Sequence, residues 1–172
     1  MFFQRSQPAL DATFAEIVRE YQAMVYSIGW HMLRDRAVAE ELAQDVFLKL
    51  YQHWGSMESR AHVANWLCRA MTQRSIDHSR RERLRPRIGL DQAPEPVGVV
   101  HDPDPVLSER LDTLVARLPE RARAIVVLRY QEDMEPAEIA TVLGGSVGAV
   151  KSNLHRSLVW MRGHLTRSGV TK

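Results

Sequence analysis

The stretch EPAEIATVLGGSVGAVKSNLHRSLVWM, residues 135–161, contains two amphipathic segments separated by two consecutive glycines. The pair Glu135-Pro136 is typical of a helix start, because proline is tolerated at the first helical position. Glycines at 144–145 allow the chain to turn sharply after the first segment. The hydroxyl of Ser146 can then cap the next helix. The stretch therefore predicts a short helix, a tight turn and a second, longer helix.

The second of these helices has an apolar side and a polar side. Its predicted buried stripe consists of Val147, Val150, Leu154, Leu158 and Met161. A short helix, a glycine turn and a second helix with a basic end form a helix-turn-helix pattern, whose second helix enters the DNA major groove. Arg can bind guanine, Ser and Asn can bond base edges or phosphate, and Lys favours phosphate. The candidate DNA contacts are Lys151, Ser152, Asn153, His155 and Arg156. From this helix alone, a solvated surface helix with a basic end is an equal alternative.

Charge is distributed unevenly, although the net charge is only +2. Residues 60–87 carry eight Arg and two acids, and residues 146–172 carry five basic residues and no acid. The remaining segments are acidic. The first basic segment is a second candidate for nucleic acid, because its arginines could neutralise phosphates and its polar residues could bind bases of an unpaired strand. Its candidate residues are Arg69, Gln73, Arg74, Asp77, Arg80 and Arg81. A solvated positive face is the alternative.

The rest of the chain also predicts helices, since apolar residues recur at spacings of three and four and no strand alternation occurs. Five of the eight prolines lie within residues 86–105, a stretch that predicts a linker. We therefore expect an all-α protein with two small helical domains, 10–84 and 106–166, joined by a flexible, Pro-rich, acidic linker over 85–105. The first helix of the chain is expected to end near Arg34-Asp35.

A polar face also marks the second predicted helix of the first half. It carries Glu40, Glu41, Gln44 and Asp45. By itself such a run is usually solvated surface.

Composition and cysteine content exclude several classes of function. Cys68 is the only cysteine, so an internal disulfide is impossible and the residue is expected to pack in the core. Neither a secretory signal nor a membrane span is evident, which favours a cytoplasmic protein. The sequence shows no metal-ligand spacing, phosphate loop or nucleophile elbow, so we expect no enzyme, no metal and no cofactor.

Several motifs together resemble the bacterial sigma factors of the extracytoplasmic-function (ECF, group IV) family. In the first half these are AEELAQDVF (39–47), WLCRAM (66–71), IDH (76–78) and RR (80–81), which look like region 2. In the second half LPER (118–121), AEIA (137–140) and VKSNLHR (150–156) look like region 4. The resemblance covers most of the chain.

The resemblance implies a transcription initiation factor that acts with core RNA polymerase. It implies that the acidic face, Glu40 to Asp45, docks on the polymerase, and that the basic helix binds and opens the minus-10 element. It further implies that the last helix reads the minus-35 element in duplex promoter DNA. An anti-sigma factor, often anchored in the inner membrane, is the implied regulator, and a stress response is the implied context.

Three departures and two alternatives stand beside this resemblance. Gln73 occupies a position where many members have Asn, and Gly148 adds a third glycine near the turn. Glu135-Pro136 replaces the Ser or Thr cap that is often seen there. The main alternative is a self-sufficient helix-turn-helix regulator whose first half dimerises or senses a signal. A third interpretation is an interaction module that binds a regulator and not DNA.

Overall fold

The computed structural model describes residues 12–84 and 105–167, which form seven α-helices and one short 3-10 helix. These ranges contain no strand, so the all-α prediction is confirmed. The predicted linker lies outside the described residues except for Pro105, where a helix begins. Residues 10 and 11 of the first predicted domain also lie outside them.

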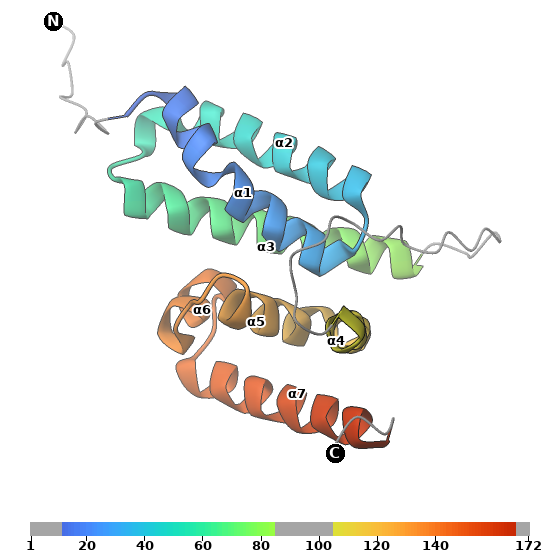
Figure 1. Ribbon diagram of the computed structural model, residues 1–172. Coiled ribbons are helices and arrows are strands. Elements are labelled where there is room, and N and C mark those ends of the chain that lie inside the picture. Colours follow the sequence, from blue (N-terminus) through green and yellow to red (C-terminus); the bar gives the residue numbers. More distant parts are fainter. Residues whose placement is uncertain (1–11, 85–104, 168–172) are drawn as a thin grey trace, which may run out of the picture.

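The first half forms a bundle of three helices. They are α1 (Phe14–Leu33), α2 (Arg36–Gln52) and α3 (Arg60–Leu84), with the 3-10 helix η1 (Trp54–Ser56) before α3 (Figure 1). Arg34 ends α1 in the left-handed conformation, with φ 57°. The carboxylate of Asp35 then accepts a hydrogen bond from the backbone N–H of Val38 at 3.0 Å, which caps α2. The predicted end of the first helix is therefore confirmed.

Gly29 lets the three helices of this bundle approach closely. A Cβ atom at Gly29 would lie 2.2 Å from Cε of Met71 on α3 and 3.4 Å from Cβ of Ala39 on α2. All three residues are buried. The missing side chain therefore leaves room for the end of the buried Met71 side chain between α1 and α3.

The second half contains the predicted helix-turn-helix. Its helices are α4 (Pro105–Arg117), α5 (Glu120–Tyr130), α6 (Pro136–Leu143) and α7 (Val147–Arg167). Pro136 opens α6, and Gly144 follows it with φ 63°, a left-handed conformation that favours glycine. The hydroxyl of Ser146 accepts a hydrogen bond from the backbone N–H of Ala149 at 3.2 Å. The helix start, the turn and the cap are thus found where the sequence predicts them.

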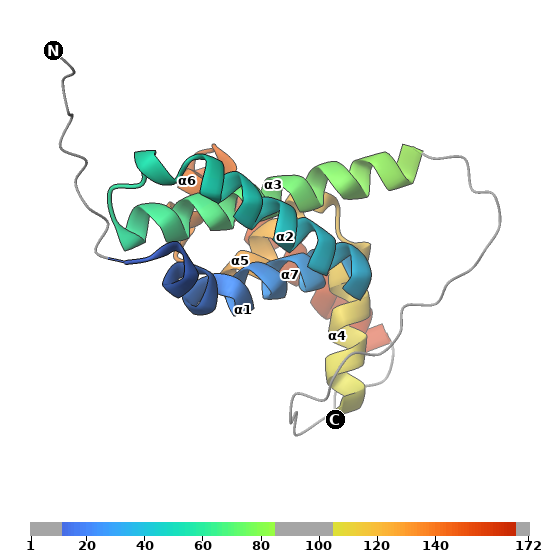
Figure 2. The same ribbon diagram turned by 90° about the horizontal axis from the view of Figure 1, so that it is seen from above.

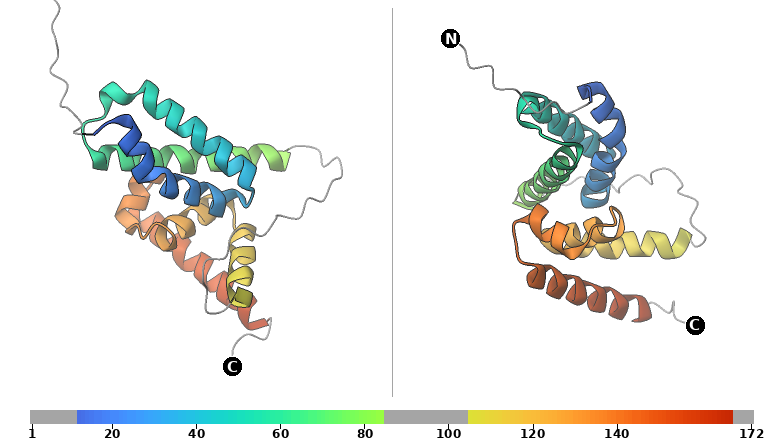
Figure 3. Two further views of the ribbon diagram at one scale, coloured as in Figure 1. Left: turned by 45° about the horizontal axis from the view of Figure 1, so that its top comes forward. Right: turned by 90° about the vertical axis from the view of Figure 1, so that its left-hand side faces the viewer.

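The two halves pack directly against each other. Figure 1 and the right-hand view of Figure 3 show α1–α3 above α5 and α6, with α7 on the far side of α5. Figure 2 shows that the end of α3 and the start of α4 project from this body. The sequence predicts two helical units, and the structure adds that they share one hydrophobic core.

Helix α5 explains why the core is shared. Its five consecutive residues 124–128 are all buried, whereas a helix with one covered face buries about every third or fourth residue. Ile125 and Leu128 belong to the core shared with the first half, whereas Val126 packs with Leu114 and Met161 of the second half. Helix α5 is therefore covered on both sides.

Candidate nucleic-acid and protein interfaces

Helix α7 presents the predicted DNA-reading residues to solvent. Lys151, Ser152, His155 and Arg156 are exposed. Asn153 is half-buried, and its amide donates to the carbonyl of Ala149 at 2.9 Å while its oxygen accepts from Nη2 of Arg156 at 3.3 Å. Asn153 therefore orients the guanidinium of Arg156 along the exposed face of the helix.

The opposite side of α7 holds the helix in the fold. Val150 and Met161 are buried, and Leu154 and Leu158 are partly buried, as the apolar stripe predicts. The prediction for Val147 is wrong, since its side chain is 39% exposed. The physical reason is position: Val147 is the first residue of α7 and follows the exposed turn 144–146.

Arg121 fixes the turn from a distance in sequence. Its Nη2 donates a hydrogen bond to the carbonyl of Leu143, the last residue of α6, at 3.2 Å. A Cβ at Gly145 would lie 3.0 Å from the same nitrogen. A cation that bonds a free carbonyl at a helix C-terminus stabilises that end. The motif LPER (118–121) contains Arg121, but the sequence did not predict that this residue would bond the end of α6.

Helix α3 carries the second candidate surface. Arg69, Gln73, Arg80 and Arg81 are exposed, and Nε2 of Gln73 donates to the partly buried carboxylate of Asp77 at 3.2 Å. Residues 69, 73, 77 and 80 follow helical spacing and so share one side of α3. The structure therefore brings most of this predicted set together on one face.

Arg74 is the exception, because it binds a residue from another predicted set. Its Nη1 lies 2.8 Å from Oδ2 of Asp45 on α2. Asp45 is partly buried, whereas Glu40, Glu41 and Gln44 on the same helix are exposed. The ion pair thus joins the acidic face of α2 to the basic helix α3.

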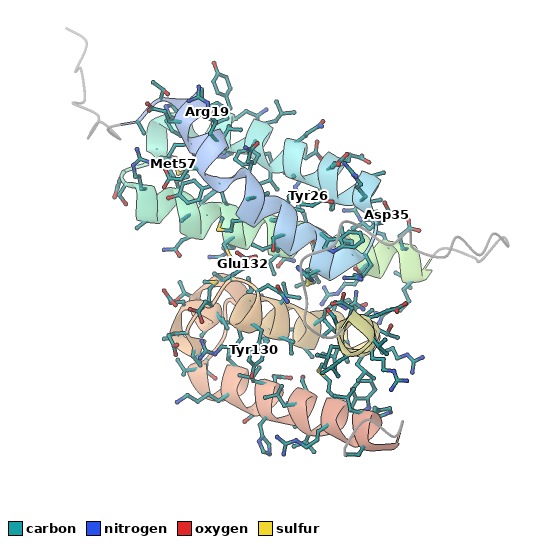
Figure 4. The ribbon with its side chains drawn as sticks, in the orientation of Figure 1. Arg19, Tyr26, Asp35, Met57, Tyr130 and Glu132 are labelled. Carbon is teal, nitrogen blue, oxygen red and sulfur yellow. The ribbon has the colours of Figure 1, made fainter. Side chains whose placement is uncertain are left out.

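An apolar groove runs beside the acidic face, between α1 and α2. Its volume is about 780 Å³, and its lining residues are Phe14, Val18, Gln22, Ala23, Tyr26, Glu40, Ala43, Gln44, Phe47, Leu48 and Tyr51. Leu48 and Tyr51 are 63% and 64% exposed, which is high for large apolar side chains. Figure 4 labels Tyr26 on α1 at this side of the bundle. The groove was not predicted from the sequence, because an apolar residue in a helical pattern is first interpreted as core. The exposure of Leu48 reveals the groove, and only the structure shows that exposure.

Cys68 is buried, as predicted, and burial raises the pKa of its thiol to about 12, so it is protonated at neutral pH. Within 12–84 and 105–167, no three His, Cys, Asp or Glu side chains gather to hold a metal ion. None of the helices in those ranges is long and apolar enough to cross a membrane.

Two family models match this chain, one for each half. Sigma-70 region 2 matches residues 17–85, and sigma-70 region 4 matches residues 108–161. The halves built around α3 and α7 are therefore sigma-70 regions.

Curated relatives narrow the class. The chain is 32% identical to the ECF RNA polymerase sigma factor SigL of Mycobacterium tuberculosis, with 89% of each protein covered. It is 28% identical to the ECF RNA polymerase sigma factor SigW of Bacillus subtilis, with 88% of each covered. It is 30% identical to the RNA polymerase sigma-E factor of Streptomyces coelicolor, over 88% of this chain and 85% of the relative.

Solved structures show the same fold. The sigma factor RpoE of Bartonella quintana, in complex with the anti-sigma factor NepR, superposes with a TM-score of 0.75 at 15% identity, covering 89% of this chain and 96% of that one. CnrH in complex with the cytosolic domain of CnrY gives a TM-score of 0.65 at 17% identity, covering 90% and 88%.

The chain belongs to the ECF RNA polymerase sigma factors, as its motifs predict. It is an alternative sigma factor that directs RNA polymerase to promoters, and the interpretation as a self-sufficient regulator is not favoured.

Proposed function

We propose that this sigma factor divides promoter recognition and polymerase binding among three exposed polar faces, one each on α7, α3 and α2. The observation that carries the proposal is that these faces lie on separate helices, each held from behind by buried side chains. Each face can therefore bind its own partner. The protein supplies recognition and no catalysis of its own, and it works where RNA polymerase works, in the cytoplasm.

Helix α7 reads the minus-35 duplex. Its exposed Lys151, Ser152, His155 and Arg156 offer one cation for phosphate and three groups able to bond base edges or phosphates. Asn153 holds Arg156 through its 3.3 Å hydrogen bond and so acts as a positioning residue on the same face.

Helix α3 binds and opens the minus-10 element. Exposed Arg69, Arg80 and Arg81 contact phosphates, and Gln73 with Asp77 forms a polar pair for an unstacked base. Arg74 joins this face by leaving Asp45 when DNA arrives.

Helix α2 docks on core RNA polymerase. Glu40, Glu41 and Gln44 are exposed, and the groove beside them adds apolar contact area to a charged rim. Asp45 supports this face through its pair with Arg74.

An anti-sigma factor is the proposed regulator. One structural neighbour is the sigma factor RpoE of Bartonella quintana, solved in complex with the anti-sigma factor NepR. Another is CnrH, solved in complex with the cytosolic domain of CnrY. For this chain we propose a partner that covers one or more of the three faces and that is anchored in the inner membrane.

Reconstituted transcription tests the proposal. Core RNA polymerase is mixed with the purified chain and with promoter fragments selected from genomic DNA by the reconstituted holoenzyme. The expected result is transcription that depends on both the chain and the minus-35 and minus-10 elements. Specific duplex binding without polymerase, and no stimulation with it, would overturn the proposal.

A further inference from the structure

The groove between α1 and α2 starts at the point where the described part of the chain starts. Phe14, the first residue of α1, and Tyr51 near the end of α2 line this end of the groove, and their ring centroids lie 5.1 Å apart. Figure 1 shows the start of α1 beside the end of α2. Ala12 packs against the hydrophobic core just before α1. The backbone therefore enters the bundle at the mouth of the groove.

The floor of the groove is apolar and open to solvent. Val18 and Phe47 line it and are half-buried, and Leu48 lines it and is exposed. Within 12–84 and 105–167 no side chain covers Leu48 or Tyr51, since both are exposed. Exposed apolar surface of this kind marks a place where another segment or molecule binds.

Residues 1–11, MFFQRSQPALD, place apolar side chains next to this groove in the sequence. They contain Phe2 and Phe3, which are two of the four phenylalanines of the chain, and Leu10. Segments that remain solvated are poor in aromatic residues, because they cannot bury enough apolar surface to offset the loss of chain entropy. Two adjacent aromatic residues in so short a segment therefore favour a bound state.

The length of the segment matches the length of the groove. On α1 the lining residues extend from Phe14 to Tyr26, which is roughly 18 Å along the helix axis at about 1.5 Å per residue. Pro8 favours a turn in the chain. Residues 2–7, extended at about 3.3 Å each, span roughly 20 Å. A segment that turns back at Pro8 can therefore run along the whole groove and bring Phe2 and Phe3 toward Tyr26.

The rim of the groove suits an extended backbone with one positive charge. Gln22 on α1 and Gln44 on α2 are exposed and line the groove from opposite sides. Their amides can donate to and accept from the backbone groups of an extended segment. Exposed Glu40 lies at the far end, where Nε of Arg36 pairs with it at 2.9 Å. Arg5, the only Lys or Arg among residues 1–11, would add a second cation at this acidic rim.

We propose that residues 2–10 dock in the groove between α1 and α2 in the free chain, with Phe2 and Phe3 as the anchors. The occupant of the groove is thus a segment of the chain itself. The inference rests on the proposed assignment of α2 and its groove to polymerase binding. The segment and polymerase compete for the groove, so the apparent affinity for polymerase falls with the fraction of chains in which the groove is filled.

Dye binding to the free chain tests the docking without polymerase. Phe2→Ser with Phe3→Ser leaves the described helices intact and should bind more of the neutral hydrophobic dye Nile red than wild type, because the groove is uncovered. Adding Leu48→Ser should remove most of this gain, which places the dye in the groove. Gln4→Ser with Gln7→Ser changes two polar residues of the same segment and should match wild type. No gain in the Phe2, Phe3 variant, or a gain that Leu48→Ser leaves intact, would overturn the docking.

A synthetic peptide of residues 1–11 gives a second readout. Added to the chain that carries Phe2→Ser and Phe3→Ser, the peptide should displace the dye, whereas a peptide with the same two substitutions should not. A version of the peptide with a benzophenone group attached should cross-link to α1 and α2, as mapped by mass spectrometry. Cross-links confined to other helices would contradict the proposed site.

Polymerase affinity tests the competition. The Phe2→Ser, Phe3→Ser variant should bind core RNA polymerase about tenfold more tightly than wild type, which corresponds to a groove filled in about nine-tenths of free chains. Gln4→Ser with Gln7→Ser should bind like wild type. Weaker binding of the Phe2, Phe3 variant would show that the segment contacts polymerase itself, and would overturn the competition.

An independent variant separates this inference from the proposed function. Charge reversal at Glu41 and Asp45 tests the polymerase-binding face of α2 without touching the segment. If the reversal leaves polymerase binding unchanged, the proposed face fails and the competition fails with it, whereas the dye and the peptide still decide the docking. If the reversal weakens binding but the Phe2, Phe3 variant binds like wild type, only the inference fails.

Discussion

The ion pair between Asp45 and Arg74 changes the role that the sequence predicts for each of the two residues. The sequence assigns Asp45 to polymerase binding and Arg74 to the minus-10 element, but the structure joins them at 2.8 Å. The two residues are 29 positions apart, so no local pattern reveals the pair. Each neutralises the other until a partner with a stronger charge competes.

Arg156 carries the sharpest prediction for DNA recognition. Arg156→Ala should lower transcription from the native promoter by roughly 5- to 100-fold, the equivalent of about 1–3 kcal/mol for one good base contact. On a promoter with a mutated minus-35 element, the variant and wild type should be equal, because the contact is already lost. Arg162→Ala, an exposed arginine further along α7, is the matched control and should have little effect. Full activity of Arg156→Ala on the native promoter would exclude the role.

The burial of Glu132 predicts that the stability of the protein depends on pH. Burial raises its pKa above the ordinary 4.5, against a smaller opposing effect of the Ser27 hydrogen bond. The folded state therefore holds this proton more tightly than the unfolded state, and the contribution of Glu132 to stability falls as pH rises from about 4.5 through the raised pKa.

Glu132→Gln removes the cost of burying a charged carboxylate. The amide oxygen can still accept the hydrogen bond from the hydroxyl of Ser27. Its Tm should exceed that of wild type at pH 7, and the difference should vanish near pH 4, as measured by circular dichroism melts across this range. A constant difference at every pH would show that ionisation of Glu132 is not the cause.

At the scale of the element, the helices follow from local sequence. Periodic apolar residues, the glycine turn and the Ser146 cap predict α6 and α7 correctly. Capping and turn chemistry act within a few residues, which is why a sequence pattern can reveal them. The exposure of Val147 is missed because helical periodicity says nothing about where neighbouring elements end.

The close packing of α1 predicts a large effect at Gly29. Gly29→Val should lower the free energy of unfolding by about 1–3 kcal/mol, because its Cβ would meet Met71 in a filled core. Urea denaturation measures this change. Gly163→Ala is the matched control: a Cβ there meets nothing within 4 Å, so the better helix propensity should stabilise α7 by up to about 1 kcal/mol. A Gly29→Val variant as stable as wild type would mean that the end of the Met71 side chain can move aside without cost.

The acidic face of α2 predicts a binding defect. Reversing charge at Glu41 and Asp45 to Lys should weaken co-purification with core RNA polymerase by about tenfold or more, since like charges across an interface cost several kcal/mol. The double variant Glu58→Lys with Glu109→Lys, at two exposed positions outside α2, controls for the same change in net charge. Unchanged co-purification of the double variant would exclude this face.

At the scale of the whole molecule, the shared core makes the two halves one cooperative unit. The full chain should unfold in a single calorimetric transition whose measured enthalpy equals the van't Hoff enthalpy. Ser27→Glu puts a second carboxylate against Glu132, so it should separate the halves and broaden or split that transition. Two transitions in wild type would show that the halves are energetically independent.

The sequence by itself determined the helices, the cap at Ser146, the two basic segments and the family, because each depends on residues near one another in the chain. Only the tertiary structure decided how the halves meet. The five buried residues in a row on α5, the hydrogen bonds from Arg123 to carbonyls of both halves and the groove between α1 and α2 all come from the way separate helices pack on one another. Contacts of that kind depend on the packing of complete surfaces, which a pattern along one segment does not encode.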